Sequence, residues 1–354
     1  MKAIITGTGS YIPTITKKNS DFLNTTFYNE KNTLFPNSNE IIIKKFKAIT
    51  GIEERRYLKP EMNSSDMGII AAKIAIKKAG INKEDLDYII VGQNFGDISH
   101  GSDQSDFLPS VASKIKYGLE IENPNCVGYD VVFGCPGWIQ GLIQANIYIK
   151  SGEAKKCLVI GTETLARVVD PYDRDSMIYA DGAGAVVVEG VESDNSNGIL
   201  STAAQTFTKE EAFYLFYGKS FNPNVNPNIN YIKMHGRKIY EFALNNVPNA
   251  MKIALDKSGV SIDKVTKILI HQANEKMDEA IVARFYKLYN KEMPKNSMPM
   301  TINKYGNSSV ATIPTLLDEI LSGNLENHQI NKGDVLLFAS VGAGMNINAV
   351  VYKY

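Results

Sequence analysis

Three side chains of the types used in nucleophilic catalysis stand in distinctive surroundings in this sequence. Cys135 is one of three cysteines and lies in "DVVFGCPGWIQG" (130–141), between two glycines and between two apolar runs. His271 is one of four histidines and lies in "ILIHQANEKMDEAI". Asn307 lies in "NKYGNSSVATIP". A thiol, an imidazole and a carboxamide can together attack a carbonyl group, handle a proton and stabilise an oxyanion.

The pattern around Cys135 predicts a strand over 129–133, a tight turn over 134–137 and an apolar helix from Trp138 to about residue 149. The sulfur would then lie at a helix N-terminus, where unpaired N–H groups and the helix dipole favour a thiolate. Pro136 suits the first helical turn. A small buried apolar role is the alternative, and it fits Cys126, in a loop, and Cys157, in a strand, better than Cys135.

The other candidate residues also have structural alternatives. His271 directly follows a buried strand, at the end where open α/β sheets collect their sites, or it is a hydrogen-bonded structural histidine. Asn307 is either a site residue or a helix cap. The segment "FASVGAGMNINAVVY" predicts a glycine-rich turn between two strands, which is either a simple connection or a source of backbone N–H groups for an oxyanion.

A papain-like cysteine protease also uses Cys, His and Asn, and the 136 positions from Cys135 to His271 fall within its usual spacing. The spacing alone does not decide between the two classes. The protease signature Cys-Gly-Ser-Cys-Trp is missing, however, and the cysteine is far from the start of the sequence. A protease is therefore disfavoured.

The elements that must position these residues alternate between apolar strands and amphipathic helices, which indicates an α/β protein with buried sheets. The segment 75–93 aligns without gaps on 254–272, an offset of 179, and 158–163 matches 336–341 at an offset of 178. Two such matches predict a duplicated α/β unit whose halves meet near residues 185–200, with domains at 1–190 and 191–354. Residues 18–40 and 218–231 are rich in Asn, Ser and Pro and predict loops or lids.

The composition narrows the class of protein. Lys and Arg total 38 and Asp and Glu total 38, so there is no net charge to hold nucleic acid or an anionic membrane. No apolar run approaches the roughly 20 residues of a membrane span. An odd number of cysteines without paired spacing indicates a reducing compartment, by default the cytoplasm. The histidines are not spaced as metal ligands, so we expect no metal.

Taken together, the motifs resemble the β-ketoacyl-acyl-carrier-protein synthase III branch of the thiolase-like condensing enzymes, over nearly the whole length. The matching segments are "GTGSYIP", "TGIEERR" (50–56), "GCPGW", "DPYDRD" (170–175), "ADGAGAVV", "HQAN", "YGNSSVATIP" and the terminal "GAG". The resemblance implies a homodimer in which each chain has two similar halves, layered α-β-α-β-α. It also implies a two-step reaction without metal or redox cofactor.

By this resemblance Cys135 is the nucleophile that accepts an acyl group, while His271 and Asn307 bind the thioester carbonyl of a malonyl or β-ketoacyl carrier-protein substrate. The backbone N–H groups of Cys135 and Ala343 match the family's oxyanion hole. The family's other contacts would fall on the substrate-binding residues Arg174, Leu108, Trp138 and Asn274, and on Lys276 for the acyl carrier protein.

Several positions depart from the family pattern. Glu53 stands where coenzyme A binders commonly have an arginine after "TGI", and "NEIIIKKFKAI" lacks their tryptophan. The segment "GDISHGSDQSDFLPSVA" is longer than usual, and Leu108 stands where many members place an aromatic residue that reaches across the dimer. These departures suggest a carrier-bound acyl donor and an altered acyl tunnel. They leave open a ketosynthase-cyclase of secondary metabolism that forms dialkylresorcinol precursors, and a non-catalytic partner subunit.

Overall fold

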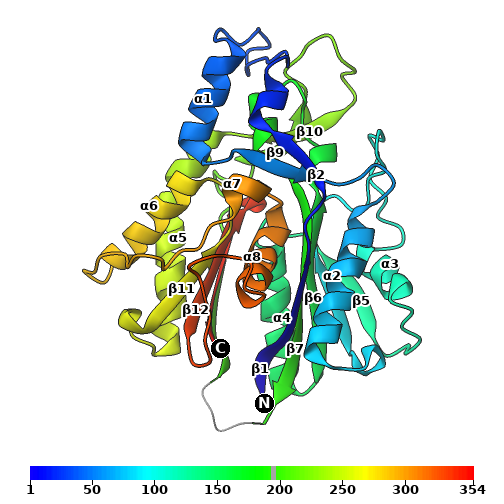
Figure 1. The fold of residues 1–354 in the computed structure, drawn as a ribbon, viewed down its shortest axis with the longest axis vertical. Helices are drawn as coiled ribbons and strands as arrows, with labels where there is room; N and C mark the ends of the chain where they lie inside the picture. Colours follow the sequence, from blue (N-terminus) through cyan, green and yellow to red (C-terminus); the bar gives the residue numbers. More distant parts are fainter. Residues whose placement is uncertain (193–196) are drawn as a thin grey trace.

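The computed structural model describes residues 1–192 and 197–354, which form five layers of alternating helices and sheets. Figure 1 shows α5 and α6 outside one sheet, α4 and α8 between the two sheets, and α2 and α3 outside the other. The helices are α1 (Asn39–Thr50), α2 (Ser64–Ala79), α3 (Val111–Gly118), α4 (Gly137–Ser151), α5 (Gly236–Ser258), α6 (Glu275–Lys287), α7 (Ile302–Tyr305) and α8 (Thr312–Leu321). The predicted α-β-α-β-α arrangement is confirmed.

The first sheet has the strand order β1-β7-β6-β4-β5. Strand β4 runs parallel to β5 and β6, whereas β7 is antiparallel to both β6 and β1. The strands are β1 (Lys2–Tyr11), β4 (Tyr88–Gly92), β5 (Val127–Val131), β6 (Lys156–Thr164) and β7 (Asp181–Val191).

The second sheet repeats this plan, with the order β11-β12-β13-β8. Strands β11 and β12 are parallel, while β13 is antiparallel to both β12 and β8. The strands are β8 (Gly198–Thr206), β11 (Val265–Ile270), β12 (Val335–Gly342) and β13 (Asn346–Lys353). Strands β8, β11, β12 and β13 thus take the places of β1, β4, β6 and β7, as a duplication requires.

The repeat predicted from the sequence has the same local structure in both halves. Helix α2 ends at Gly80 and helix α5 at Gly259, with φ of 69° and 71°, in the left-handed region that glycine tolerates best. One 3₁₀ turn follows each glycine, capped by the side chain of Asn82 in the first half and of Ser261 in the second. Strands β4 and β11 come next. The two halves therefore share the same succession of helix, glycine, 3₁₀ turn and strand.

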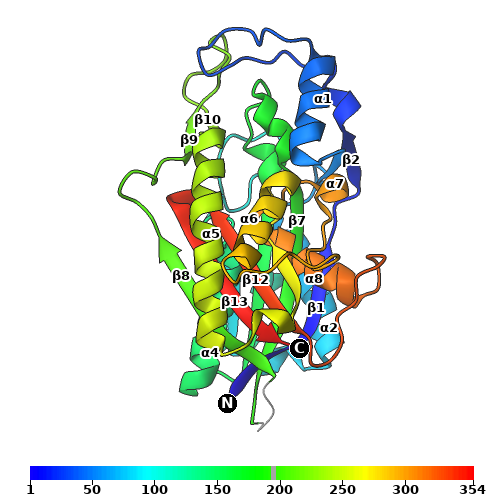
Figure 2. The same ribbon diagram turned by 90° about the vertical axis from the view of Figure 1, so that its left-hand side faces the viewer.

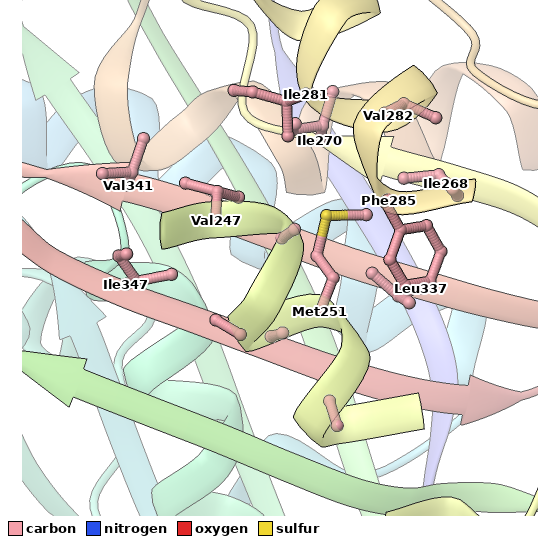
Figure 3. Close-up of a cluster of buried hydrophobic side chains, with 14 of the residues drawn as sticks. Val247, Met251, Ile268, Ile270, Ile281, Val282, Phe285, Leu337, Val341 and Ile347 are labelled. Atoms are coloured by element: carbon pink, nitrogen blue, oxygen red, sulfur yellow. The ribbon is translucent and has the colours of Figure 1, made fainter. Parts of the chain in front are cut away.

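Strands buried on both faces explain the continuous apolar runs. On β11, Ile268 and Ile270 pack against α5 and α6, whereas Leu269 between them packs into the middle layer. Figure 2 shows α5 and α6 in front of this sheet, and Figure 3 shows Met251 and Phe285 of these helices over Ile268 and Leu337. Because both faces of β11 are buried from Ile268 to Ile270, this part of the strand lacks the alternation of polar and apolar residues that is seen in half-exposed strands.

The middle layer joins the two halves. Helices α4 and α8 bury their apolar sides against both sheets, and the cluster between them includes Leu142, Leu316 and Phe338. All strands of the first sheet precede residue 192, and all strands of the second follow residue 197. The proposed meeting zone at 185–200 includes residues 193–196, which lie outside the described residues. The division into separate domains at 190/191 stays a prediction, because α8 of the second half packs on β1 and β7.

Smaller elements gather at one end of the two sheets (Figure 1). They are α1, α7, and two antiparallel two-stranded sheets. One sheet pairs β2 (Ile15–Lys18) with β3 (Glu54–Tyr57), and the other pairs β9 (Leu215–Lys219) with β10 (Asn230–Met234). The segment predicted as a loop over 218–231 is the connection of the β9–β10 pair, with its first and last residues inside the strands. Within residues 1–192 and 197–354, no helix combines the length and apolar character required to cross a bilayer.

Truncation of Leu316 should destabilise the protein strongly, because this side chain is fully buried between both sheets. We expect Leu316→Ala to lower the free energy of unfolding by about 2–5 kcal/mol, the usual range for a leucine that leaves a cavity. Leu288→Ala is the matched control, since Leu288 is 42% exposed. Urea unfolding measures both changes, and equal small losses for the two variants would contradict the assigned middle layer.

Candidate active site

Cys135 lies in a tight turn between β5 and α4, as predicted. Gly134 has a φ of 66°, and its carbonyl accepts the N–H of Gly137, which closes the turn. Pro136 is the N-cap of α4, so Cys135 lies two residues before the first residue of the helix. The strand ends at Val131, two residues earlier than predicted, because Val132 and Phe133 already leave the sheet to form the approach to the turn.

A second glycine-rich turn presses against the turn that carries Cys135. A Cβ placed on Gly134 would lie 2.6 Å from the backbone nitrogen of Ala343, and a Cβ on Gly342 would collide with the backbone nitrogen of Cys135. Both positions therefore require glycine. This contact brings the backbone of Ala343, in the turn between β12 and β13, beside Cys135, as the resemblance implied.

His271 directly follows β11 and reaches the same region from the second half. Its backbone N–H donates to Ala339, and its ring Nδ1 lies 2.8 Å from Thr312 Oγ1. The Thr312 hydroxyl also lies 3.0 Å from the Ser309 carbonyl. It either donates to that carbonyl and accepts from Nδ1, or donates to Nδ1, and these two arrangements correspond to the two neutral tautomers of the ring.

Asn307 is fixed at both its backbone and its side chain. Its N–H donates to the Ile178 carbonyl at 3.0 Å, and its own carbonyl accepts the N–H of Ala180 at 2.8 Å. The Asn307 Oδ1 atom accepts the N–H of Ser309 at 2.8 Å, so Nδ2 remains available as a donor. The N-cap of α8 is Ala311, so Asn307 does not have the alternative role of a cap for that helix.

One cavity of 840 Å³ is lined by Cys135, His271 and Asn307 together. Its wall also includes Phe46 of α1, Leu215 of β9 and Met277 of α6. The three predicted residues, which are far apart in the sequence, therefore share a single space. That space is large enough for a thioester with an attached chain.

Burial sets the charge states of the two titratable groups. It lowers the pKa of His271 to about 3, so the ring is neutral at physiological pH. Burial also raises the pKa of the Cys135 thiol to about 11, while a hydrogen bond from Ser309 lowers it. Burial therefore opposes the thiolate that the helix N-terminus was expected to favour.

The remaining predicted residues divide into those inside and those outside the cavity. Arg174 and Asn274 line it, although the Asn274 side chain also caps α6 by accepting the N–H of Met277. Lys276 is exposed in the first turn of α6. Trp138 was expected to bind substrate but lies in the core, 1% exposed, with its ring edge against Phe338. Leu108 is 90% exposed and does not line the cavity within one chain.

Several residues at the site were missed by the sequence analysis. The Phe35 ring lies 4.8 Å from the Arg174 guanidinium, in the cavity wall. Lys233 of β10 is buried and pairs with Asp170 at 2.6 Å and with Asp173 at 2.9 Å. This pair of contacts fixes the β9–β10 hairpin onto the "DPYDRD" segment. No local pattern could have revealed partners about 60 positions apart.

Arg55 of the "TGIEERR" segment has a structural role that the sequence did not reveal. Its guanidinium is buried and donates to the carbonyls of Lys17 and Met177 and to Asn19 Oδ1. Gly306 packs on it, since a Cβ at that glycine would lie 2.6 Å from the Arg55 Cβ. Arg55 therefore supports the turn that leads into Asn307.

Two family models match this chain, and relatives with assigned names align with nearly all of it. Residues 129–207 match the family model described as 3-oxoacyl-[acyl-carrier-protein (ACP)] synthase III, and residues 255–354 match the model of its C-terminal part. The chain is 30% identical over its full length to β-ketoacyl-[acyl-carrier-protein] synthase III of Paracoccus denitrificans, of which it covers 99%. It is 33% identical over 99% of its length to the synthase III of Caldanaerobacter subterraneus, of which it covers 97%.

A solved structure agrees with these relatives. The 3-oxoacyl-[acyl-carrier-protein] synthase III of Aquifex aeolicus VF5 superposes with a TM-score of 0.81 at 30% identity, covering 99% of this chain and 100% of that one. Fold and comparisons together define a condensing acyltransferase of the thiolase-like fold. The chain belongs to the 3-oxoacyl-[acyl-carrier-protein] synthase III family.

The buried neutral His271 predicts a specific pH dependence of stability. Its pKa is about 3 in the folded protein, below the ordinary value of 6.5, so between these pH values only the unfolded chain takes up the proton. Stability therefore falls as the pH drops below 6.5, by about 2 kcal/mol from this residue between pH 7 and pH 5.

His271→Gln should lack this loss, because glutamine does not titrate. Urea unfolding at pH 7 and pH 5 measures the difference between the two proteins. An identical pH dependence for wild type and variant would contradict the assigned burial.

Proposed function

We propose that this chain joins an acyl group held on Cys135 to a carbanion formed from a malonyl thioester, with His271 and Asn307 stabilising the charge on the thioester oxygen. The observation that carries the proposal is the single cavity lined by all three side chains. Each of them comes from a different segment, and each is fixed by its own backbone contacts. A structural role for all three would not require a shared space of this size.

In the first step the Cys135 sulfur attacks the carbonyl carbon of an acyl thioester. A C–S bond forms, the carbonyl oxygen takes up negative charge, and the donor thiol leaves as the carbonyl re-forms. The backbone N–H groups of Cys135 and Ala343 lie on the two turns that contact each other and supply donors for that oxygen. The product of this step is an acyl-enzyme.

In the second step a malonyl thioester loses CO₂, and the electron pair of the broken C–C bond passes to the thioester as an enolate. We propose the neutral tautomer of His271 with its proton on Nε2, in which Nδ1 accepts from Thr312, so that Nε2 and the Asn307 Nδ2 group both donate to the enolate oxygen. The enolate carbon then attacks the acyl carbon, a C–C bond forms, and the C–S bond to Cys135 breaks. The electron pair of the broken C–C bond ends in the new C–C bond, and that of the broken C–S bond returns to sulfur, so the step needs no external oxidant or reductant.

Acyl carrier protein is the proposed partner, because the names of the relatives include it. The cavity wall carries the cationic side chains of Lys45, Arg174, Arg237 and Lys238 together with the carboxyl groups of Glu30, Asp173 and Asp175, and Lys276 is exposed on the adjoining α6. An acidic carrier or a phosphate-bearing pantetheine chain is complementary to such a rim. Coenzyme A and carrier-protein thioesters share this chemistry, so both remain candidate acyl donors.

We further propose that the chain works as a homodimer in the cytoplasm. Strand β5 is an edge strand of the first sheet, and exposed apolar side chains lie on and near it, including Leu108, Tyr117 and Val132. An edge strand with apolar neighbours is a surface that a second copy would protect. Leu108 would then reach a partner's cavity, in line with its predicted role.

The ketosynthase-cyclase alternative has no specific support among the described residues, and we retain synthase III activity as the proposed function. A panel of coenzyme A and carrier-protein thioesters of graded chain length separates the two. Rapid loading from acetyl-coenzyme A would exclude the secondary-metabolite alternative.

Mass spectrometry of the intact protein after incubation with acyl thioesters tests the nucleophile. We expect one acyl adduct on the wild-type chain and none on Cys135→Ala, since only the Cys135 thiol lines the cavity while Cys126 and Cys157 are 1% and 0% exposed. Cys126→Ala is the matched control and should load normally. An adduct that persists in Cys135→Ala would exclude the assignment.

His271→Ala and Asn307→Ala should separate loading from condensation. Both variants should still form the acyl adduct, but the rate of condensation should fall about 10²–10³-fold for each, the usual effect of removing one donor to an oxyanion. Single-turnover release of CO₂ from a malonyl thioester measures the second step. If the variants lose loading but condense from preloaded enzyme, their roles are assigned to the wrong step.

A further inference from the structure

Glu163 is a buried carboxyl group beside the active site that the proposed reaction does not use. It lies near the C-terminal end of β6, is 0% exposed, and its Oε1 atom has no hydrogen-bond partner among the described residues. Its charge acts on Cys135, because a charged Glu163 raises the pKa of that thiol. A buried carboxyl group with one unsatisfied oxygen is costly to keep, so its contacts merit a functional explanation.

A continuous set of hydrogen bonds runs from Glu163 to the sulfur. The backbone N–H and the Nδ2 group of Asn94 both donate to Glu163 Oε2, at 3.0 and 2.8 Å. The same Nδ2 group lies 3.3 Å from Ser309 Oγ, and Ser309 Oγ donates to Cys135 Sγ at 3.3 Å. Asn94 follows β4, Glu163 is on β6, and Ser309 precedes α8, so three separate elements meet at this sulfur.

The direction of these bonds is fixed by Glu163. Its Oε2 atom accepts from Asn94, so the Asn94 amide must present Nδ2 rather than Oδ1, and the second Nδ2 hydrogen faces Ser309 Oγ. Ser309 Oγ therefore accepts from Asn94, and its own hydrogen is left for the sulfur. With the amide reversed, the hydroxyl would donate to Asn94 Oδ1 instead.

Ser309 has a backbone conformation that is unfavourable for a residue other than glycine. Its φ is 53°, in the left-handed region that non-glycine residues seldom adopt. Its N–H donates to Asn307 Oδ1, and its carbonyl accepts from Thr312. An unfavourable backbone conformation that is held by hydrogen bonds, here to Asn307 and Thr312, is typical of a functional position.

We propose that Glu163, Asn94 and Ser309 form a hydrogen-bond relay that directs the Ser309 hydroxyl at Cys135 Sγ and stabilises negative charge on the sulfur. Ser309 touches the reacting atom, whereas Glu163 and Asn94 are positioning residues. The inference rests on the proposed function, since it assigns three further residues to the same nucleophile.

The sulfur carries negative charge twice in the proposed reaction. It does so as the thiolate that attacks the donor thioester, and again as the leaving group when the C–S bond breaks and its electron pair returns to sulfur. A hydrogen bond to a charged acceptor stabilises it more than one to a neutral acceptor. The relay would therefore lower the barrier of both steps, in a cavity where burial opposes the thiolate.

The charge of Glu163 is compatible with this role. Burial raises its pKa to about 8, with a further contribution from Asp181 on β7, while the two bonds from Asn94 lower it. The charged or titratable groups that face it are Asp181 and Cys135. Below pH 8 the carboxyl group is neutral, so it orients Asn94 through Oε2 without placing a second negative charge beside the thiolate.

The test measures the rate at which iodoacetamide alkylates Cys135 from pH 6 to pH 11, with peptide mass spectrometry to confirm the residue. No acyl donor is needed, so the result is independent of whether the chain condenses thioesters. Ser309→Ala should slow alkylation about tenfold at pH 8, the effect of a rise of about one unit in the pKa of the thiol. Ser308→Ala removes a neighbouring hydroxyl outside the relay and should match the wild type.

Two substitutions at Glu163 separate positioning from simple packing. Glu163→Gln keeps an acceptor for Asn94 and should alkylate within about twofold of the wild type at pH 7, whereas Glu163→Leu removes the acceptor and should behave like Ser309→Ala. Asn94→Ala should also resemble Ser309→Ala, and it tests the relay if the leucine variant does not fold. A wild-type alkylation profile in Ser309→Ala, or equal profiles for the glutamine and leucine variants, would overturn the proposal.

Discussion

The structure of this site depends on the close contact between two glycine-rich turns, one from each half of a duplicated fold. Gly134 and Gly342 lie where any side chain would collide with the backbone of the other turn. This contact brings Cys135 beside Ala343, and Cys135 lines the same cavity as His271 and Asn307. A single half could supply a nucleophile at a helix N-terminus, but the residues that would stabilise the enolate all come from the other half.

Burial then sets the chemistry of each group in the cavity. The same loss of solvent that keeps His271 neutral also disfavours the Cys135 thiolate. A site of this kind needs donors aimed at the sulfur as well as at the substrate oxygen. Ser309 supplies one, and its orientation depends on Asn94 and on a carboxyl group that burial keeps neutral below pH 8.

The sequence predicted those parts of the fold that local patterns encode. The sequence of helix, glycine, turn and strand that occurs in each half could be predicted, because Gly80 and Gly259 cap equivalent helices 179 positions apart. Cys135, His271 and Asn307 were candidates from their local settings, and the resemblance to the condensing enzymes joined them into one site. The contacts of Glu163 with Asn94 and of Phe35 with Arg174 could not be predicted, since they join elements with no shared pattern. Trp138 was predicted to bind substrate but lies in the core, because an aromatic residue close to a nucleophile in the sequence can face the core as readily as the cavity.

The acyl-loading rate of Gly342→Ala tests the contact between the halves most directly. The φ of Gly342 is −166°, which alanine adopts without strain, so the substitution adds only a methyl group against the Cys135 turn. Gly128→Ala is the control, because Gly128 does not have a positive φ and a Cβ there meets no atom closer than 3.4 Å. The account predicts that Gly342→Ala loads acyl groups on Cys135 about 10²-fold more slowly than Gly128→Ala, as expected for a reacting group displaced by about 1 Å. Equal loading rates in the two variants would contradict it.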